Sequence, residues 1–426
     1  MRFGRVLMIG VLAGWGSAAC SDGGGEEWGG TMTDSAGIVV VHNTGDEDWS
    51  LVAQPVVTEE LSLGELDGAA ELQFGQIAAI DVAPDGTMYV LDQQAAQVRV
   101  FDATGEFVRT VGKPGNGPGE LSPGTAGLLV GDGDTLHVAD MMRQRIQRYG
   151  PDGEDAGGAP VPFAEGIPIV WSITPERQFV TQVRVMRMPG TPDAAAPRAP
   201  RDWLLLRDAS GTVVDTLIGL ESGQTLDFSG DAPRMRLFSS EPVWALLSDG
   251  SLVHGRNDGY RLEVVDAAGT VERVVTRPFG REAVTESDRE GLRRLMREAM
   301  QQQAQAPPAA IEQFISSIEF ADHYPAYARI LGGPGNTIWV QHIRTAAMAE
   351  REGRTFDPQD IGAPEWDVFD REGRFLGVVT MPPRFQPLRV VDDRVYGVQR
   401  DELDVQHVVR LRVTGLGTAQ DSMEEQ

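Results

Sequence analysis

Polar residues recur at one position of a repeated pattern, and they are the residues of this chain whose types could carry chemistry. The pattern is Asp85–Asp92 (DGTMYVLD), which returns five times in weaker form. At the position where each copy ends, five of the six copies hold a polar side chain: Asp92, Asp140, Arg256, His342 and Gln399. Carboxylates, a guanidinium and an imidazole at one rim could bind a polar ligand or move a proton. We therefore take these five as candidate ligand-binding residues and assign no catalytic residue.

The histidines do not show the spacing of a metal site. All six are scattered over the repeat, and neither His-x-His nor Glu-x-x-His occurs. A zinc site needs about four ligands. Asp132-Gly133-Asp134 resembles a fragment of a calcium loop, but the later Glu is missing. We expect no cofactor, and a zinc or calcium ion bound by groups from different repeats remains the alternative.

The candidate residues are positioned by short apolar runs that are separated by turn signals. The first set of runs is Gln76–Val82, Met88–Leu91, Val98–Phe101 and Phe107–Val111. Val, Ile, Phe and Tyr at period two favour half-buried strands, and Asp-Gly and Thr-Gly suit tight turns. Four antiparallel strands joined in this way form a meander, which is the unit of a propeller blade.

The repetition of this unit predicts the fold class. The copies begin at Asp85, Gly133, Glu176, Asp249, Gly335 and Asp392. A propeller repeat has roughly 40–50 residues, and the two steps that are much longer contain insertions. We predict an all-β fold, a six-bladed β-propeller of four-stranded antiparallel blades that spans 36–415.

The sixth copy stops after three strands, at Val413, while an N-terminal strand has no blade of its own. We predict that strand 56–63 pairs with strand 407–413 and closes the ring, because this pairing removes two open edges. A disordered tail is expected over 416–426.

Four large insertions interrupt the repeats, and all fall where a propeller has the loops of a single face. They are 184–202, 219–241, 278–324 and 343–364. Long loops on one face of a rigid scaffold are usual binding surfaces. The third contains two amphipathic segments, which predict a helical hairpin over 281–322 between blades four and five. This hairpin could be a lid or a docking surface, and the simplest expectation is that its apolar stripe packs onto the propeller.

The first blade resembles the NHL repeat of six-bladed propellers. The resemblance lies in Tyr89-Val90-Leu91-Asp92, in Val98–Asp102 and in the Gly-rich GKPGNGPGEL that follows. It implies a bacterial NHL-type propeller lipoprotein, and some relatives of this type are metal-dependent lyases. Their catalytic histidines do not match positions of this sequence.

The N-terminus has the features of an export signal. Arg2 and Arg5 precede an apolar run over Val6–Trp15, and small residues lead to Cys20, the only cysteine. The pattern predicts a lipoprotein signal peptide over 1–20 with lipidation of Cys20, followed by a Gly-rich, acidic tether over 21–35. We expect an exported protein that is membrane-anchored through its lipid and faces the periplasm or the cell exterior. An ordinary signal peptide is the alternative.

Composition restricts the partners. With 37 basic and 63 acidic residues the formal charge is −26, and an acidic surface repels phosphate, which argues against nucleic acid. The expected ligand is a protein, a peptide or a glycan on the loop-rich face of a monomer. We therefore predict a non-catalytic binding scaffold, and a lyase or hydrolase at the channel mouth, with or without a metal, is the alternative.

Overall fold

The computed structural model describes residues 28–44, 55–184, 201–223, 226–227, 234–266, 269–303, 307–351, 356 and 361–416. The expected signal peptide, Cys20, the first part of the tether and residues 417–426 lie outside the described residues. Most of the insertion over 184–202 does so as well.

Six sheets form a ring, and each contains the four antiparallel strands of one blade, so the predicted fold class is confirmed. Blade one comprises β4 (Ile77–Val82), β5 (Met88–Asp92), β6 (Gln97–Phe101) and β7 (Phe107–Val111). Blade two comprises β8 (Thr125–Val130), β9 (Leu136–Asp140), β10 (Arg145–Tyr149) and β11 (Asp155–Pro160). Blade three comprises β12 (Ile167–Ile173), β13 (Phe179–Arg184), β14 (Arg201–Arg207) and β15 (Val213–Glu221).

The second half of the chain repeats this arrangement. Blade four comprises β18 (Pro242–Leu246), β19 (Leu252–Arg256), β20 (Arg261–Val265) and β21 (Val271–Thr276). Blade five comprises β23 (Ile330–Gly332), β24 (Ile338–Ile343), β25 (Gly362–Phe369) and β26 (Phe375–Thr380). Blade six comprises β27 (Phe385–Val391), β28 (Arg394–Arg400), β29 (Gln406–Thr414) and β3 (Val56–Leu63).

The ring closes within blade six. The N-terminal strand β3 pairs antiparallel with β29, with Leu63 opposite Val408 and Val56 opposite Thr414. A side-chain contact adds to this closure, because Oε1 of Gln406 accepts the backbone N–H of Ile77 at 2.8 Å and links blade six to blade one. Strand β29, the third strand of blade six, is therefore paired on both edges.

The core consists of one apolar cluster at each of the six junctions between neighbouring blades. Between blades one and two, for example, Leu91 and Val98 pack with Leu128 and Val138, and all four are buried. Strand β5 is buried along its whole length, whereas the outer strand β7 is mainly exposed. This gradient matches the sequence of the blade, since Met88–Leu91 of β5 are all apolar and β7 includes the polar residues Arg109 and Thr110.

The recurring Asp at the end of the third strand holds the hairpin to the fourth strand. In four blades its Oδ1 accepts the backbone N–H four residues further on, which is a local arrangement typical of Asp in turns. The pairs are Asp102 with Glu106, Asp208 with Thr212, Asp266 with Thr270, and Asp370 with Arg374, at 2.8–3.0 Å.

The tether is shorter than predicted. Residues Thr31–Ser35 form strand β1, which pairs with β2 (Ile38–His42), and β2 adds in parallel to the outer edge of β21. Blade four thus has six strands. Ala36 and Gly37, both with positive φ, form the β1–β2 turn. Strand β1 is not evident in the sequence, because its surroundings are rich in Gly and acidic residues. The Ala-Gly turn before the apolar run Ile38–Val41 is the feature that indicates a hairpin.

Candidate functional site

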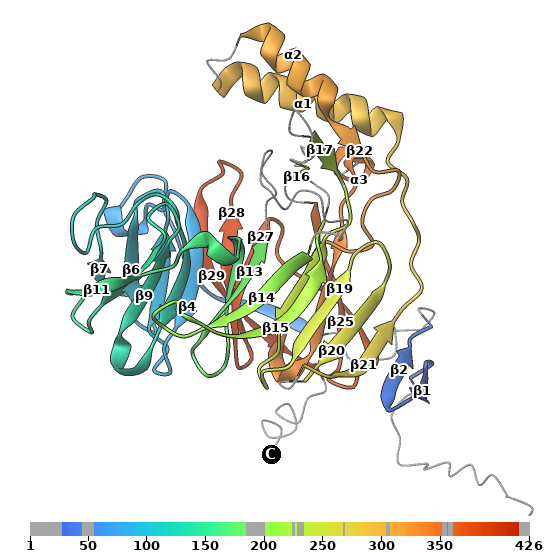
Figure 1. The fold of residues 1–426 in the computed structure, drawn as a ribbon, viewed down its shortest axis with the longest axis horizontal. Coiled ribbons are helices and arrows are strands. Elements are labelled where there is room, and N and C mark those ends of the chain that lie inside the picture. Colours follow the sequence, from blue (N-terminus) through green and yellow to red (C-terminus); the bar gives the residue numbers. More distant parts are fainter. Residues whose placement is uncertain are drawn as a thin grey trace, which may run out of the picture.

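The described parts of three insertions, 219–241, 278–324 and 343–364, lie together on one face of the ring, which we call the elaborated face (Figure 1). It carries α1 (Glu286–Gln303), α2 (Pro308–Ser317) and α3 (Ala346–Arg351), and the short strands β16 (Leu226–Asp227), β17 (Arg234–Leu237) and β22 (Glu319–Phe320). Strand β17 pairs with β16 and, in parallel, with β22. Three separate insertions therefore combine into one substructure, which we call the cap.

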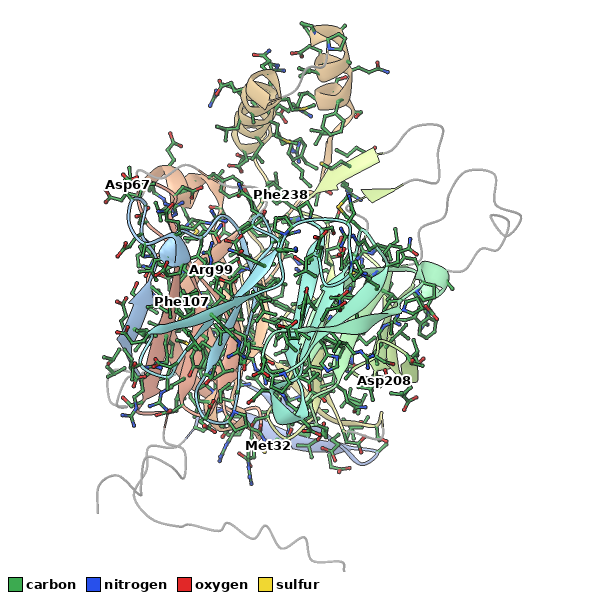
Figure 2. The ribbon with its side chains drawn as sticks, turned by 90° about the vertical axis from the view of Figure 1, so that its left-hand side faces the viewer. Met32, Asp67, Arg99, Phe107, Asp208 and Phe238 are labelled. Atoms are coloured by element: carbon green, nitrogen blue, oxygen red, sulfur yellow. The ribbon has the colours of Figure 1, made fainter. Side chains whose placement is uncertain are left out.

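The cap has its own apolar core. The ring of Phe238 lies 4.5 Å from that of Tyr324 and 6.2 Å from that of Phe356, and Leu292 of α1 is buried in the same cluster. Phe238 lies between the helices and the ring in Figure 2. Ile311 and Ile315 of α2 pack with Met296 of α1 in a second cluster.

The helical hairpin therefore differs from the simplest expectation. Its apolar stripes pack against each other and against the cap strands, instead of lying flat on the propeller. The two helices project from the ring as a result (Figure 1). The hairpin has a narrow base, because Ala283 and His323 form an antiparallel bridge and the N–H of Val284 donates to the carbonyl of Asp322 at 2.9 Å.

Two of the five candidate residues hold the backbone and are not accessible to a ligand. Asp92 and Asp140 are both fully buried. Asp92 accepts the N–H groups of Gly75, Gln76 and Ala95, at 2.9–3.2 Å. Asp140 accepts the N–H and the hydroxyl of Ser122 and the N–H of Arg143, at 2.5–3.2 Å. Each carboxylate fastens the loop that leads into its blade to the turn between the second and third strands.

Arg256 and Gln399 lie at separate places on the rim. Arg256 forms ion pairs with Glu221 and Asp258 at 3.2 Å, at the connection between blades three and four. Gln399 donates through Nε2 to the carbonyl of Pro383 at 3.3 Å in blade six. Among the described residues, no hydrogen bond or ion pair joins any two of the five candidates.

His342 belongs to a polar cluster at the junction of blades four and five. Its Nε2 lies 2.7 Å from Oδ1 of Asp367, which is 1% exposed. Oδ2 of the same carboxylate accepts the hydroxyl of Tyr260 at 2.5 Å and Nη1 of Arg277 at 2.6 Å. The His342 side chain is 36% exposed, so a buried carboxylate orients an imidazole that solvent can reach.

Electrostatics keep this carboxylate ionised. Burial alone would raise the pKa of Asp367, but the hydrogen bond and charge of His342 and the charge of Arg277 hold that pKa below its ordinary value. Burial, and secondly the charge of Asp367, raises the pKa of Tyr260 far above its ordinary value, so the phenol remains a donor. Arg277 also stacks on the ring of Phe375, with its guanidinium carbon 3.9 Å from the ring centre.

The sequence comparison of second strands found His342 but missed its three partners. Asp367 lies inside the apolar run of a third strand, WDVF, where a carboxylate must have a partner, and this was the available signal. Tyr260 and Arg277 lie beside β20 and β21 of the neighbouring blade, and only the ring brings them to Asp367.

No group of three or more His, Cys, Asp or Glu side chains that could hold a metal ion occurs among the described residues. The described helices also include none that is both long and apolar enough to cross a membrane.

Comparison with known proteins identifies the architecture. A family model described as a 6-bladed beta-propeller matches residues 62–159. No curated protein matches the sequence.

Several solved structures are similar to this chain. A Bacteroides fragilis protein described as exported has a TM-score of 0.48 at 10% identity, over 88% of this chain and 99% of that chain. A protein from Bacteroides vulgatus has a TM-score of 0.47 at 11% identity, over 84% of this chain and 98% of that chain. An inactive variant of virginiamycin B lyase from Staphylococcus aureus, solved with quinupristin, has a TM-score of 0.42 at 11% identity, over 85% and 100%. The six sheets and the family match together identify this chain as a six-bladed β-propeller.

Proposed function

We propose that this chain is an envelope-anchored propeller lipoprotein of the NHL type that holds a protein, peptide or glycan on its elaborated face without catalysis. The supporting observation is the cap, in which three insertions share one apolar core on one face of the ring. The turns of the opposite face remain minimal, as at Ala83–Gly86 and Leu247–Gly250, where the glycine N–H donates to the carbonyl of the first residue. A fold that needed the insertions only for stability would have no reason to place them on one face.

Two defined libraries test the binding function. The full chain is immobilised and presented with random peptides on phage and with a printed glycan array. We expect at least one peptide or glycan class to bind saturably, and the bound complex to show slowed hydrogen exchange on the elaborated face. Protection confined to the opposite-face turns, or no saturable ligand in either library, would contradict the proposal.

A deletion shows whether the helices take part. Residues 287–316 are replaced by a short Gly-Ser linker, which is feasible because the bridge between Ala283 and His323 already joins the two ends. We expect affinity to fall at least tenfold if the ligand contacts the hairpin. The matched control is Arg371→Gln with Glu372→Gln, an exposed pair on the opposite face, which should leave affinity unchanged.

Lipid anchoring has its own test. The full-length protein is expressed in a Gram-negative host with a tritiated palmitate label. We expect label in the membrane fraction for the wild type and none for Cys20→Ser. Equal partitioning of both proteins into the soluble fraction would contradict the anchor and leave the binding proposal intact.

A second candidate function, an enzyme of the lyase or hydrolase class, is favoured by one observation. Buried Asp367 orients the partly exposed imidazole of His342, an arrangement suited to a general base. A panel of chromogenic esters and lactones tests it. Turnover should disappear in His342→Gln, and its pH profile should shift in Asp367→Asn. Turnover that survives His342→Gln would remove this candidate.

A further inference from the structure

The central channel of the propeller contains a small cavity. The inner strands β4, β8, β12 and β27 line it, and its volume is about 100 Å³. Most of the residues that line it are apolar, with Ala78, Ile173 and Leu388 among them, although polar atoms form the larger part of the exposed wall; of the described residues in the lining, Arg389 alone is charged. A cavity of this size holds a molecule of a few heavy atoms.

Among the described residues, Arg389 forms its ion pair with Asp81, a carboxylate that it shares with Arg177. Asp81, which is fully buried, accepts Nη1 and Nη2 of Arg177 at 3.2 and 2.7 Å. It also accepts the backbone N–H of Val130 at 2.8 Å and that of Val82 at 2.9 Å. Nε of Arg389 lies farther away, 3.5 Å from Oδ1. Two guanidinium groups thus share one carboxylate, which leaves one net positive charge.

Two buried N–H groups of residues that line the cavity have no hydrogen-bond acceptor among the described residues. Nε of Arg389 and Nε1 of Trp171 are shielded from solvent, and neither donates a hydrogen bond to another described residue. The Arg389 side chain is 20% exposed. Burial lowers the pKa of Arg389 and the charge of Arg177 adds to this effect, while the charge of Asp81 opposes both. A buried donor without an acceptor is costly, so an acceptor for either N–H group would be favourable.

The indole of Trp171 is held in place. Its ring meets that of Phe179 edge-on, with centres 5.2 Å apart. On the other side it lies over Gly127, where a Cβ would come within 3.0 Å of the indole. Gly127 therefore provides the space that the indole occupies.

We infer that the central channel binds a small monovalent anion, a short carboxylate or a halide, with the Arg389 guanidinium as countercharge and the Trp171 indole N–H as a second donor. Apolar side chains such as Ile173 and Leu388 in the lining can contact the methyl group of a short carboxylate. A divalent anion would exceed the single net charge of the cluster. This site lies in the ring itself and is independent of the ligand proposed for the elaborated face.

The first measurement compares acetate with acetamide, which is similar in shape but neutral. The thermal midpoint of the full chain is recorded against each, at constant ionic strength in sodium sulfate. We expect acetate to raise the midpoint saturably by a few degrees and acetamide to have no such effect, since a ligand that binds only the folded state stabilises it. Equal responses to the two compounds would overturn the inference.

Three variants locate the effect. Arg389→Gln should abolish the saturable response, and Trp171→Phe, which keeps an aromatic ring but removes the N–H, should weaken acetate binding about three- to tenfold. Arg371→Gln removes the same charge from a side chain that is 73% exposed and should behave as the wild type. If Arg389→Gln does not fold, Trp171→Phe carries the test. A full acetate response in Trp171→Phe or in a folded Arg389→Gln would overturn the site.

Bromide distinguishes the two kinds of anion. Crystals of the full chain soaked in bromide should show an anomalous peak between Arg389 and Trp171 if halides bind, and acetate should displace it. A midpoint response to acetate without a bromide peak assigns the site to carboxylates. Water alone at this position, with no response to either anion, would overturn the inference.

Discussion

Nε2 of His342 in β24 lies 2.7 Å from Oδ1 of Asp367 in β25, and the second oxygen of this carboxylate holds Tyr260 and Arg277 of the preceding blade. One buried carboxylate therefore connects blades four and five and also orients the one candidate residue that has an accessible imidazole. Asp367 is buried and His342 is partly exposed, so substitutions of these two residues can separate a structural role of the cluster from a functional one.

Replacing Asp367 by Asn should lower the free energy of unfolding by about 3–5 kcal/mol, since Arg277 would lose its buried countercharge. His342→Gln should cost less, about 1 kcal/mol, because the imidazole is 36% exposed and its partner keeps two other donors. Urea unfolding measures both. Equal losses in the two variants would mean that the carboxylate does not organise the cluster.

The same carboxylate predicts a loss of stability in acid. Its folded-state pKa lies below the ordinary value of 3.8, so its contribution is complete above that value and is lost as pH falls through the lower folded-state pKa. Asp367→Asn should remove this part of the acid dependence. The measurement is the urea midpoint between pH 5 and pH 2, and curves that stay parallel for wild type and variant would contradict it.

Two buried histidines predict a second dependence on pH, at higher pH. Burial lowers the pKa of His137 and of His254, and Glu263 opposes this at His254. The unfolded state therefore binds more protons below the ordinary value of 6.5, and stability falls as pH drops from there towards the lowered pKa values. The slope approaches about 1.4 kcal/mol per pH unit for each histidine. His254→Gln should reduce the slope between pH 6.5 and 5 and leave the interval from pH 7 to 8 unchanged.

Asn43 should fasten the N-terminal hairpin to the ring. It is 3% exposed, its Nδ2 donates to the carbonyl of Gly373 at 3.0 Å, and its Oδ1 accepts the N–H of Phe375 at 2.8 Å. Asn43→Ala should cost about 2–3 kcal/mol, because it leaves buried backbone groups without partners. Hydrogen exchange should accelerate in β1 and β2. The matched change Thr33→Ala, on exposed β1, should have neither effect, and unchanged exchange in Asn43→Ala would contradict the assignment.

Asp140 should matter for folding and not for binding. Asp140→Ala removes three hydrogen bonds from a fully buried carboxylate and leaves Arg143 without its ion pair. We expect a loss of about 2–4 kcal/mol in urea unfolding. Asp85→Ala, in an exposed turn, should cost much less, since the N–H of Thr87 that its Oδ1 accepts is close to solvent. Any peptide or glycan affinity of the folded Asp140→Ala protein should equal that of the wild type.

The strands could be predicted from the sequence because their signal is local. Strands β5 and β6 contain the buried apolar residues Tyr89, Leu91, Val98 and Val100, because neighbouring blades cover both faces of these two strands. The turn signals that end the strands lie beside them in the chain. The pairing of β3 with β29 could be predicted from the same patterns, because the N-terminal strand has no blade of its own and the sixth repeat has only three strands. Strand β1 could not be predicted, because an exposed strand in an acidic, Gly-rich context carries almost no apolar signal.

The candidate site depended on the tertiary structure. Asp92 and His342 occupy the same position of the repeat, yet the first is buried against backbone N–H groups and the second is accessible. The two positions differ in the loop that follows. After Asp92 a short turn at Ala95 encloses the carboxylate, whereas after His342 an insertion that contains α3 leaves the imidazole accessible.

Sequence alone determined how many blades form and which faces of their strands are buried, because hydrophobic periodicity is set by neighbours a few residues away. Only the tertiary structure decided which charges meet. Asp367 and Tyr260 are 107 residues apart, and Asp81 and Arg177 are 96 residues apart. Closing the ring brings such pairs together at the blade junctions and in the channel, where a buried charge must find its partner.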